Sequence, residues 1–221
     1  MKNRIKIKAL VGALDLQADV TFSDEMIIIS GENGAGKTTL LRCLAGLETA
    51  RGHMLVKQQL WLDSAADFVL PTQIRHIGCV WPDAALLPWL TAEKNITLGI
   101  DQVDDSWLNL LAERLEITAL MQRKPHMLST GEAQRVALVR AIYRKPSALL
   151  LDEPFSAQAP AIRQRLRAVL KAVQVELNIP VIMVSHDRED AEMLADQHWR
   201  MREGRLLTQA FETSVNRKLQ A

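Results

Sequence analysis

The chain has only two cysteines, Cys43 and Cys79, in 221 residues. They show none of the short spacings at which zinc-binding cysteines recur. We therefore interpret them as reduced thiols of a cytoplasmic protein. The chain also has almost no net charge. Its 27 Lys and Arg nearly balance its 26 Asp and Glu, which gives a formal net charge of +1. A nucleic-acid-binding surface normally leaves a larger basic excess, so we expect no nucleic-acid partner.

Long hydrophobic runs are absent as well. No stretch approaches the roughly 20 apolar residues of a membrane-spanning helix, so we expect no transmembrane segment. Basic residues alternate with isoleucines near the N-terminus, at Lys2, Arg4, Ile5, Lys6, Ile7 and Lys8. This alternation favours a strand at a solvated edge over the basic region of a signal peptide. With 48% hydrophobic and 24% charged residues, residues 1–221 are predicted to form one globular unit without a disulfide or structural metal.

Residues 31–39, GENGAGKTT, fit the phosphate-loop pattern G-x-x-x-x-G-K-[ST]. An apolar run precedes them and a helical segment follows, which distinguishes the loop from a glycine-rich turn that carries a lysine by chance. Glycines let the backbone wrap around phosphates, so that N–H groups and the helix start face the anion. The predicted nucleotide-binding residues are Gly31, Glu32, Asn33, Gly34, Ala35, Gly36, Lys37, Thr38 and Thr39. Lys37 should reach the β- and γ-phosphates, and Thr38 should ligate Mg²⁺.

A second acidic element follows at residues 148–154, ALLLDEP. The apolar run predicts a central strand of a parallel α/β sheet, with Asp152 at the carboxyl end where ligands collect. We expect Asp152 to hold Mg²⁺ through water and Glu153 to polarise a water for attack on the γ-phosphate. A surface turn is the alternative for two acids before a proline, but the phosphate loop in the same chain favours the site.

Residues 128–141, LSTGEAQRVALVRA, contain a helix start. Ser129 and Glu132 are spaced as a capping box, and Val136, Val139 and Tyr143 recur at helical spacing. An ordinary capped surface helix would show the same pattern. The position of this segment just ahead of the acidic strand suggests a more specific role.

The segment resembles the signature motif of ATP-binding cassette (ABC) ATPases, usually written LSGGQ, with Thr130 for the first glycine and Glu132 for the glutamine. The resemblance implies ATP contacts from Ser129, Thr130, Gly131 and Glu132. It continues at residues 179–187, IPVIMVSHD, where a predicted buried strand ends in His186. His186 resembles the family's switch histidine, which would contact the γ-phosphate and position the water with Glu153. A lone histidine is otherwise more often structural.

The resemblance covers roughly residues 5–207, with the motifs in the family's order. It implies an α/β fold: a P-loop NTPase (ABC ATPase) core with a mainly parallel sheet, an antiparallel β portion near the N-terminus and an inserted helical subdomain at approximately residues 95–145. Within this insertion a 3.6-residue rhythm predicts core packing by Trp107, Leu110, Leu111, Arg114 and Leu115.

Several positions depart from the family pattern. Pro82 stands where these ATPases carry a metal-contacting glutamine, and proline has no side-chain ligand atom. Residues 156–159 read SAQA where the family usually has SALD, so Ala159 replaces the aspartate that crosses the dimer interface. No aromatic residue precedes Phe22, which lies too close to the phosphate loop to stack on adenine. These departures predict weaker metal coordination, weaker interface coupling and a loosely held base.

Residues 70–80, LPTQIRHIGCV, and 86–91, LLPWLT, resemble the ATPase subunits of importers, and those of molybdate-type oxyanion importers in particular. Molybdate-type ATPases usually continue into a C-terminal oxyanion-binding domain, whereas a short polar tail follows Leu207 here. The resemblance implies an ATP-hydrolysing subunit of an ABC transporter, with ATP and Mg²⁺ as cofactors. The departures predict a slow turnover, and the transported substrate stays open.

The implied partners are a second ATPase domain, in a head-to-tail homodimer, and a separate membrane permease. A short coupling helix of the permease is expected in a groove near residues 81–89. The alternative for Trp81 and Trp89 is that they pack against the rest of the domain. The expected location is cytoplasmic and peripheral, on the inner face of the cell membrane. The alternative function is a degenerate or soluble ABC ATPase that acts as an ATP-dependent dimerisation switch.

Overall fold

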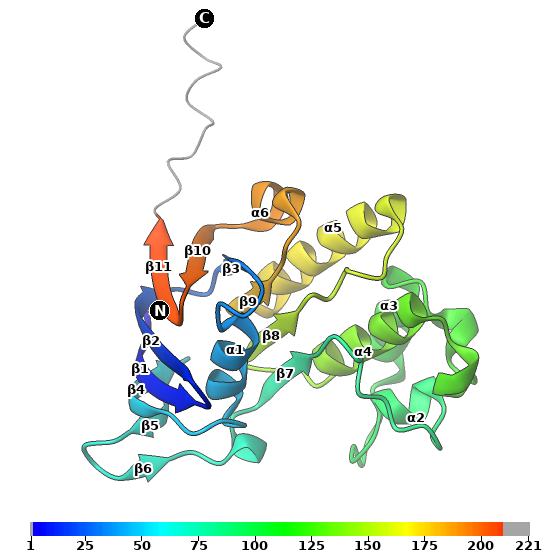
Figure 1. The fold of residues 1–221 in the computed structure, drawn as a ribbon. Helices are drawn as coiled ribbons and strands as arrows, with labels where there is room; N and C mark the ends of the chain where they lie inside the picture. The colour runs from blue at the N-terminus through cyan, green and yellow to red at the C-terminus, as the bar shows by residue number, and fades with distance from the viewer. Residues whose placement is uncertain (1, 210–221) are drawn as a thin grey trace, which may run out of the picture.

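The computed structural model describes residues 2–209. One mixed sheet of eleven strands runs through the described residues in the order β6-β5-β4-β1-β2-β11-β10-β3-β9-β8-β7 (Figure 1). The strands are β1 (Asn3–Val11), β2 (Leu14–Phe22), β3 (Met26–Ser30), β4 (Arg51–Val56), β5 (Gln59–Asp63), β6 (Phe68–Val69), β7 (Ile77–Val80), β8 (Ala148–Asp152), β9 (Val181–Val184), β10 (Gln197–Arg202) and β11 (Arg205–Gln209). The α-helices are α1 (Lys37–Ala45), α2 (Ala92–Ile96), α3 (Asp105–Arg114), α4 (Thr130–Tyr143), α5 (Pro160–Leu177) and α6 (Arg188–Leu194). Short 3-10 helices are η1 (Thr72–Ile74), η2 (Thr118–Leu120) and η3 (Pro125–Met127).

The parallel half of the sheet comprises β10, β3, β9, β8 and β7. Alternate side chains of these strands enter two different cores. Ile28 and Leu149 pack with residues of α3, α4 and α5, whereas Ile27 and Leu150 pack with α1 and the antiparallel strands. Both faces are therefore covered, which is why β3, β8 and β9 are apolar at nearly every position. The prediction of buried parallel strands is confirmed.

The antiparallel half contains β6, β5, β4, β1 and β2. Ile5 and Ile7 are buried and Lys6 and Lys8 are exposed, as the alternation predicts. The expected edge position of this strand was wrong, because β1 lies between β2 and β4. Alternation reports only which face of a strand meets water, and the β4 partner comes from a distant part of the chain.

Helices α2, α3 and α4 lie together at one side of the parallel half (Figure 1). Trp107, Leu111 and Leu115 are buried there, as the helical rhythm predicts. Leu110 is 36% exposed and Arg114 pairs with Glu176 at 2.8 Å, so these two do not belong to the core. Whether the segment forms a separate subdomain stays a prediction. Residue 1 and residues 210–221, which include most of the polar tail, lie outside the described residues.

Both cysteines are free thiols in the structure. Burial raises the pKa of Cys43 to about 11 and that of Cys79 to about 12. The thiols therefore stay protonated and poorly nucleophilic near neutral pH. Within residues 2–209, no helix has the length and apolar character needed to span a bilayer.

Candidate nucleotide site

The phosphate loop connects β3 to α1 through residues 31–36. Gly31 has φ 153, and a Cβ there would lie 2.2 Å from the Met201 carbonyl oxygen, so only glycine fits. Gly36, the residue before α1, has φ 102, which is a conformation that side-chain-bearing residues rarely adopt. No side chain caps this end of α1 in the structure of residues 2–209. The first N–H groups of the helix are thus available to an anion.

Lys37 places a positive charge inside this loop. Its side chain is 7% exposed, and its Nζ donates to the carbonyl oxygens of Gly31 at 2.8 Å and Glu32 at 2.9 Å. Burial lowers the pKa of Lys37, while the nearby carboxylates of Glu153 and Asp152 raise it. The loop therefore combines an ammonium group with the start of a helix, which suits a phosphate chain.

Thr38 and Asp152 meet where α1 passes the carboxyl end of β8. The Thr38 hydroxyl donates to Asp152 Oδ2 at 2.7 Å, and Asp152 is 2% exposed. Burial raises the pKa of Asp152, and the Thr38 hydrogen bond and Lys37 oppose that rise. Hydroxyl and carboxylate oxygens are ligands that Mg²⁺ accepts. In the described part of the chain no group of three His, Cys, Asp or Glu side chains could hold a metal.

Glu153 and His186 come together from the ends of two neighbouring strands. Glu153 follows β8 with φ 52, a left-handed conformation that is uncommon for a residue with a side chain. Its N–H donates to the Val184 carbonyl at 3.0 Å. The resulting turn brings Glu153 Oε1 to 3.0 Å from His186 Nε2. Both side chains remain partly exposed, at 27% and 45%, so water can reach the pair.

A cavity of about 440 Å³ joins these groups. It is lined by Leu14, Asn33, Gly34, Gly36, Lys37, Thr38, Thr39, Pro82, Asp152, Glu153, Ser156, Val184 and His186. Glu32 and Ala35 line an adjoining hollow together with Asn33 and Gly34. The structure thus gathers the predicted loop, acidic and histidine residues at one site. Pro82 lies on its wall, where the family resemblance places a glutamine.

The signature segment lies elsewhere. Ser129 caps α4 by accepting from the Glu132 N–H at 3.2 Å, and Glu132 Oε2 accepts from the Ser129 N–H at 2.7 Å. The predicted capping box is confirmed. Ser129 and Thr130 are exposed, and none of the cavity-lining residues named above belongs to this segment. Within one copy of the chain, this segment and the phosphate loop therefore form separate surfaces.

Sequence reasoning missed Leu14. A Cβ on Gly36 would meet Leu14 Cδ2 at 2.9 Å, so the leucine packs directly on the phosphate loop. Leu14 begins β2, and no motif surrounds it that could have indicated this place. Phe22, at the other end of β2, is 2% exposed and packs edge-on against Trp199 in the core, with ring centroids 5.5 Å apart. Its ring does not line the cavity.

The parallel sheet, the phosphate loop after β3 and the acidic end of β8 define a P-loop nucleotide-binding fold. Comparison with known proteins narrows this class. The family described as ABC transporter matches residues 17–156, and the chain belongs to that family.

Curated relatives extend the match over most of the chain. "Molybdenum import ATP-binding protein ModC 1" of Azotobacter vinelandii is 37% identical over 223 residues, which cover 98% of this chain and 62% of that protein. "Spermidine/putrescine import ATP-binding protein PotA" of Vibrio cholerae is 34% identical over 206 residues, covering 90% of this chain and 52% of that protein. The chain thus spans roughly half to three fifths of the length of these relatives.

Among solved structures, the dimeric post-hydrolysis state of an ATP-binding cassette bound to ADP and Pi has a TM-score of 0.79 to this chain. The two share 23% sequence identity, and the match covers 95% of this chain and 98% of that one. At this identity the similarity establishes the fold.

Proposed function

We propose that this chain is the ATP-binding and ATP-hydrolysing subunit of an ABC importer. The observation that carries the proposal is the Glu153–His186 pair at 3.0 Å, beside the buried Thr38–Asp152 contact at the mouth of the phosphate loop. The names of the relatives support import, and the molybdenum relative that matches 98% of the chain supports a molybdate-like oxyanion as cargo. The spermidine/putrescine relative supports the importer class with a different cargo.

The residues of the site divide the chemistry among them. Lys37 and the N-terminus of α1 hold the triphosphate. Thr38 and Asp152 would hold Mg²⁺, which would neutralise charge on the phosphate oxygens. Glu153 accepts a proton from the attacking water, and its carboxylate is held by His186 from the end of β9. His186 also lines the cavity, so the Glu153–His186 pair faces the space that the terminal phosphate would occupy.

Two copies of the chain would complete each site. Ser129, Thr130, Gly131 and Glu132 lie outside the cavity of their own chain, at an exposed helix N-terminus. In a head-to-tail dimer they would cover the nucleotide held by the partner's phosphate loop. The dimeric cassette with the same fold supports this arrangement.

The membrane partner would use a second hollow, of about 790 Å³, between the parallel core and the helical segment. Trp81 and Trp107 line it, together with Leu47 and Ile100. Trp89 is 66% exposed and is not among its lining residues. We propose that this hollow receives a short helix of a permease, which places the chain peripherally on the inner face of the cell membrane. Co-purification with a membrane subunit tests this partner, and its absence would favour a dimerisation switch.

The test of hydrolysis is Glu153→Gln. The amide keeps the shape of the carboxylate but does not accept the proton, so turnover should fall by about 100-fold or more while MgATP still binds. Glu192→Gln, at an exposed position of α6, is the matched control. A Glu153→Gln variant that hydrolyses MgATP at the parent rate would refute the catalytic assignment.

A further inference from the structure

The loop between Glu153 and α5 is bonded to the start of α4 by two buried glutamines. Gln158, which is 6% exposed, donates from Nε2 to the Gly131 carbonyl at 2.8 Å. Gln134, which is 1% exposed, donates to Ser156 Oγ at 3.1 Å and accepts from the Ala157 N–H at 3.3 Å. Buried side-chain hydrogen bonds of this kind hold two segments in one relative position.

The loop packs closely against Gly131. A Cβ on Gly131 would lie 2.8 Å from the Ala157 carbonyl oxygen and 3.3 Å from the Gln158 amide atoms. The loop therefore packs against the backbone of the signature segment itself. Any shift of this helix end must carry the loop with it or break the Gln158 hydrogen bond.

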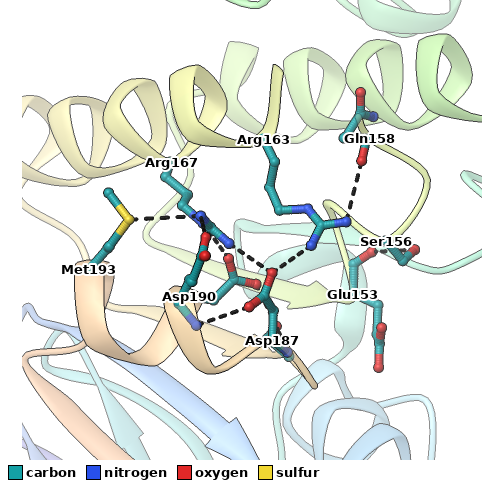
Figure 2. Close-up of polar contacts among 10 residues, drawn as sticks. Glu153, Ser156, Gln158, Arg163, Arg167, Asp187, Asp190 and Met193 are labelled. Carbon is teal, nitrogen blue, oxygen red and sulfur yellow. Dashed lines mark hydrogen bonds and ion pairs between the residues drawn. The ribbon is translucent and has the colours of Figure 1, made fainter. Parts of the chain in front are cut away.

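The same loop is bonded to the segment that carries His186 (Figure 2). The Gln158 carbonyl accepts from Arg163 Nη2 at 3.3 Å, and Arg163 Nη1 donates to Asp187 Oδ2 at 2.5 Å. Arg167 donates to the same carboxylate oxygen at 2.8 Å. Asp187 is the residue after His186, so Arg163 joins the histidine segment to Gln158.

The loop is also tied to the catalytic carboxylate's own residue, because Ser156 Oγ donates to the Glu153 carbonyl at 3.0 Å. Gln158 thus joins the signature segment to the residue that follows His186, while Gln134 and Ser156 join the same helix to Glu153. Leucine, which the family pattern has at this position, has no side-chain amide and could not donate to the Gly131 carbonyl.

We propose that Gln158 is a positioning residue that transmits the position of the signature segment to His186 of the same chain, and through His186 to its partner Glu153. This inference rests on the proposed function, in which the signature segment contacts the nucleotide held by a second copy. A nucleotide bound at that segment would then set the geometry of the Glu153–His186 pair through Gln158, Arg163 and Asp187. This route lies within one chain and does not need the interface aspartate that Ala159 replaces.

The test uses two substitutions at Gln158 in the full chain. Gln158→Met removes the donor at similar volume, and Gln158→Glu keeps the shape but presents an acceptor to the Gly131 carbonyl. Both variants should lower kcat for MgATP hydrolysis by about 10-fold or more, since a buried donor is lost or reversed. KM and the calorimetric Kd for MgATP should stay within about 2-fold, because the phosphate loop is untouched. Gln164→Met, at an exposed position one turn along α5, should behave as the parent.

Thermal unfolding identifies the variants that fold. If Gln158→Met does not fold, the kcat of the near-isosteric Gln158→Glu variant tests the role of Gln158. The inference is overturned if a folded Gln158 variant has the same kcat as the parent. It is also overturned if kcat and the affinity for MgATP fall by the same factor. Glu153→Gln is measured in the same assay. If that variant also retains parent turnover, the proposed hydrolytic site itself is wrong, whereas loss of turnover only in Glu153→Gln rejects the role of Gln158 alone.

Discussion

Within residues 2–209, no side chain caps the N-terminus of α5, and Ala159→Asp should supply a cap. Ala159 has φ −63 and ψ 149, the extended geometry of an N-cap residue, but its methyl group cannot accept a hydrogen bond. Pro160 follows at the first helical position, and no acidic residue lies in the first turn. Because Ala159 is exposed, an aspartate has room to accept from the N–H groups of the first turn.

The expected gain follows from two contributions. A good N-cap is worth about 1 kcal/mol relative to alanine, and a negative charge at a helix N-terminus adds about 0.3–1 kcal/mol. The sum of about 1–2 kcal/mol corresponds to a rise in Tm of about 2–8 °C for a domain of this size. The gain should be somewhat smaller in high salt, since the contribution of the charge is screened.

Thermal and urea unfolding measure the effect. Ala159→Asn caps without charge and should give most of the gain, whereas Ala157→Asp, at an exposed position before the cap, should give none. An unchanged Tm in Ala159→Asp would refute the capping argument. The same variant should raise MgATP turnover if interface coupling limits the parent, and turnover is measured separately because a more stable helix alone does not change kcat.

Three further predictions concern the site and its surroundings. Lys37→Ala should weaken MgATP binding by about 10-fold or more, because it removes the ammonium that faces the phosphates. Calorimetry measures the Kd for MgATP, with Lys8→Ala on β1 as the control. Equal Kd values in Lys37→Ala and the parent would contradict the phosphate site. Pro82→Gln should raise kcat for MgATP hydrolysis several-fold, because it adds an amide oxygen at the cavity wall. An unchanged Tm shows that the variant folds. An unchanged kcat would show that other groups already compensate for the missing glutamine. The hydrogen bond from the Ser129 N–H holds the pKa of Glu132 below its ordinary value of 4.5, so this carboxylate stabilises the fold above that value and loses its effect as the pH falls through the lower folded-state pKa. The stability difference between the parent and Glu132→Gln should therefore narrow as the pH falls below 4.5, and a constant difference would show that the charge contributes nothing.

Local chemistry explains what could be predicted from the sequence. The Ser129–Glu132 capping box joins residues three positions apart, so spacing alone specifies it. The glycines of the phosphate loop are required by the backbone within that loop and by its contact with Met201. The apolar runs of β3 and β8 predict burial on both faces whatever lies above and below them.

Contacts between segments that lie far apart in the sequence could not be predicted from it. Leu14 reaches the phosphate loop because β2 begins beside that loop in the folded protein, and no pattern around Leu14 indicates this. Leu110 fits the helical rhythm of α3, but the body of the protein covers Leu111 and leaves Leu110 36% exposed. The position of β1 inside the sheet depends on β4, whose residues follow α1 in the chain.

The phosphate loop, the acidic strand end and the helix start of the signature segment could be predicted without a structure, because each depends on residues within a few positions of one another. In contrast, Glu153 in its left-handed turn meets His186, 33 residues further along the chain, at 3.0 Å only once the chain has folded. Only the folded chain likewise brings Gln158 to the Gly131 carbonyl. These contacts arise from the order of β8 and β9 in the sheet and from the packing of α4 against the loop that follows β8, and the geometry of the packed core sets both.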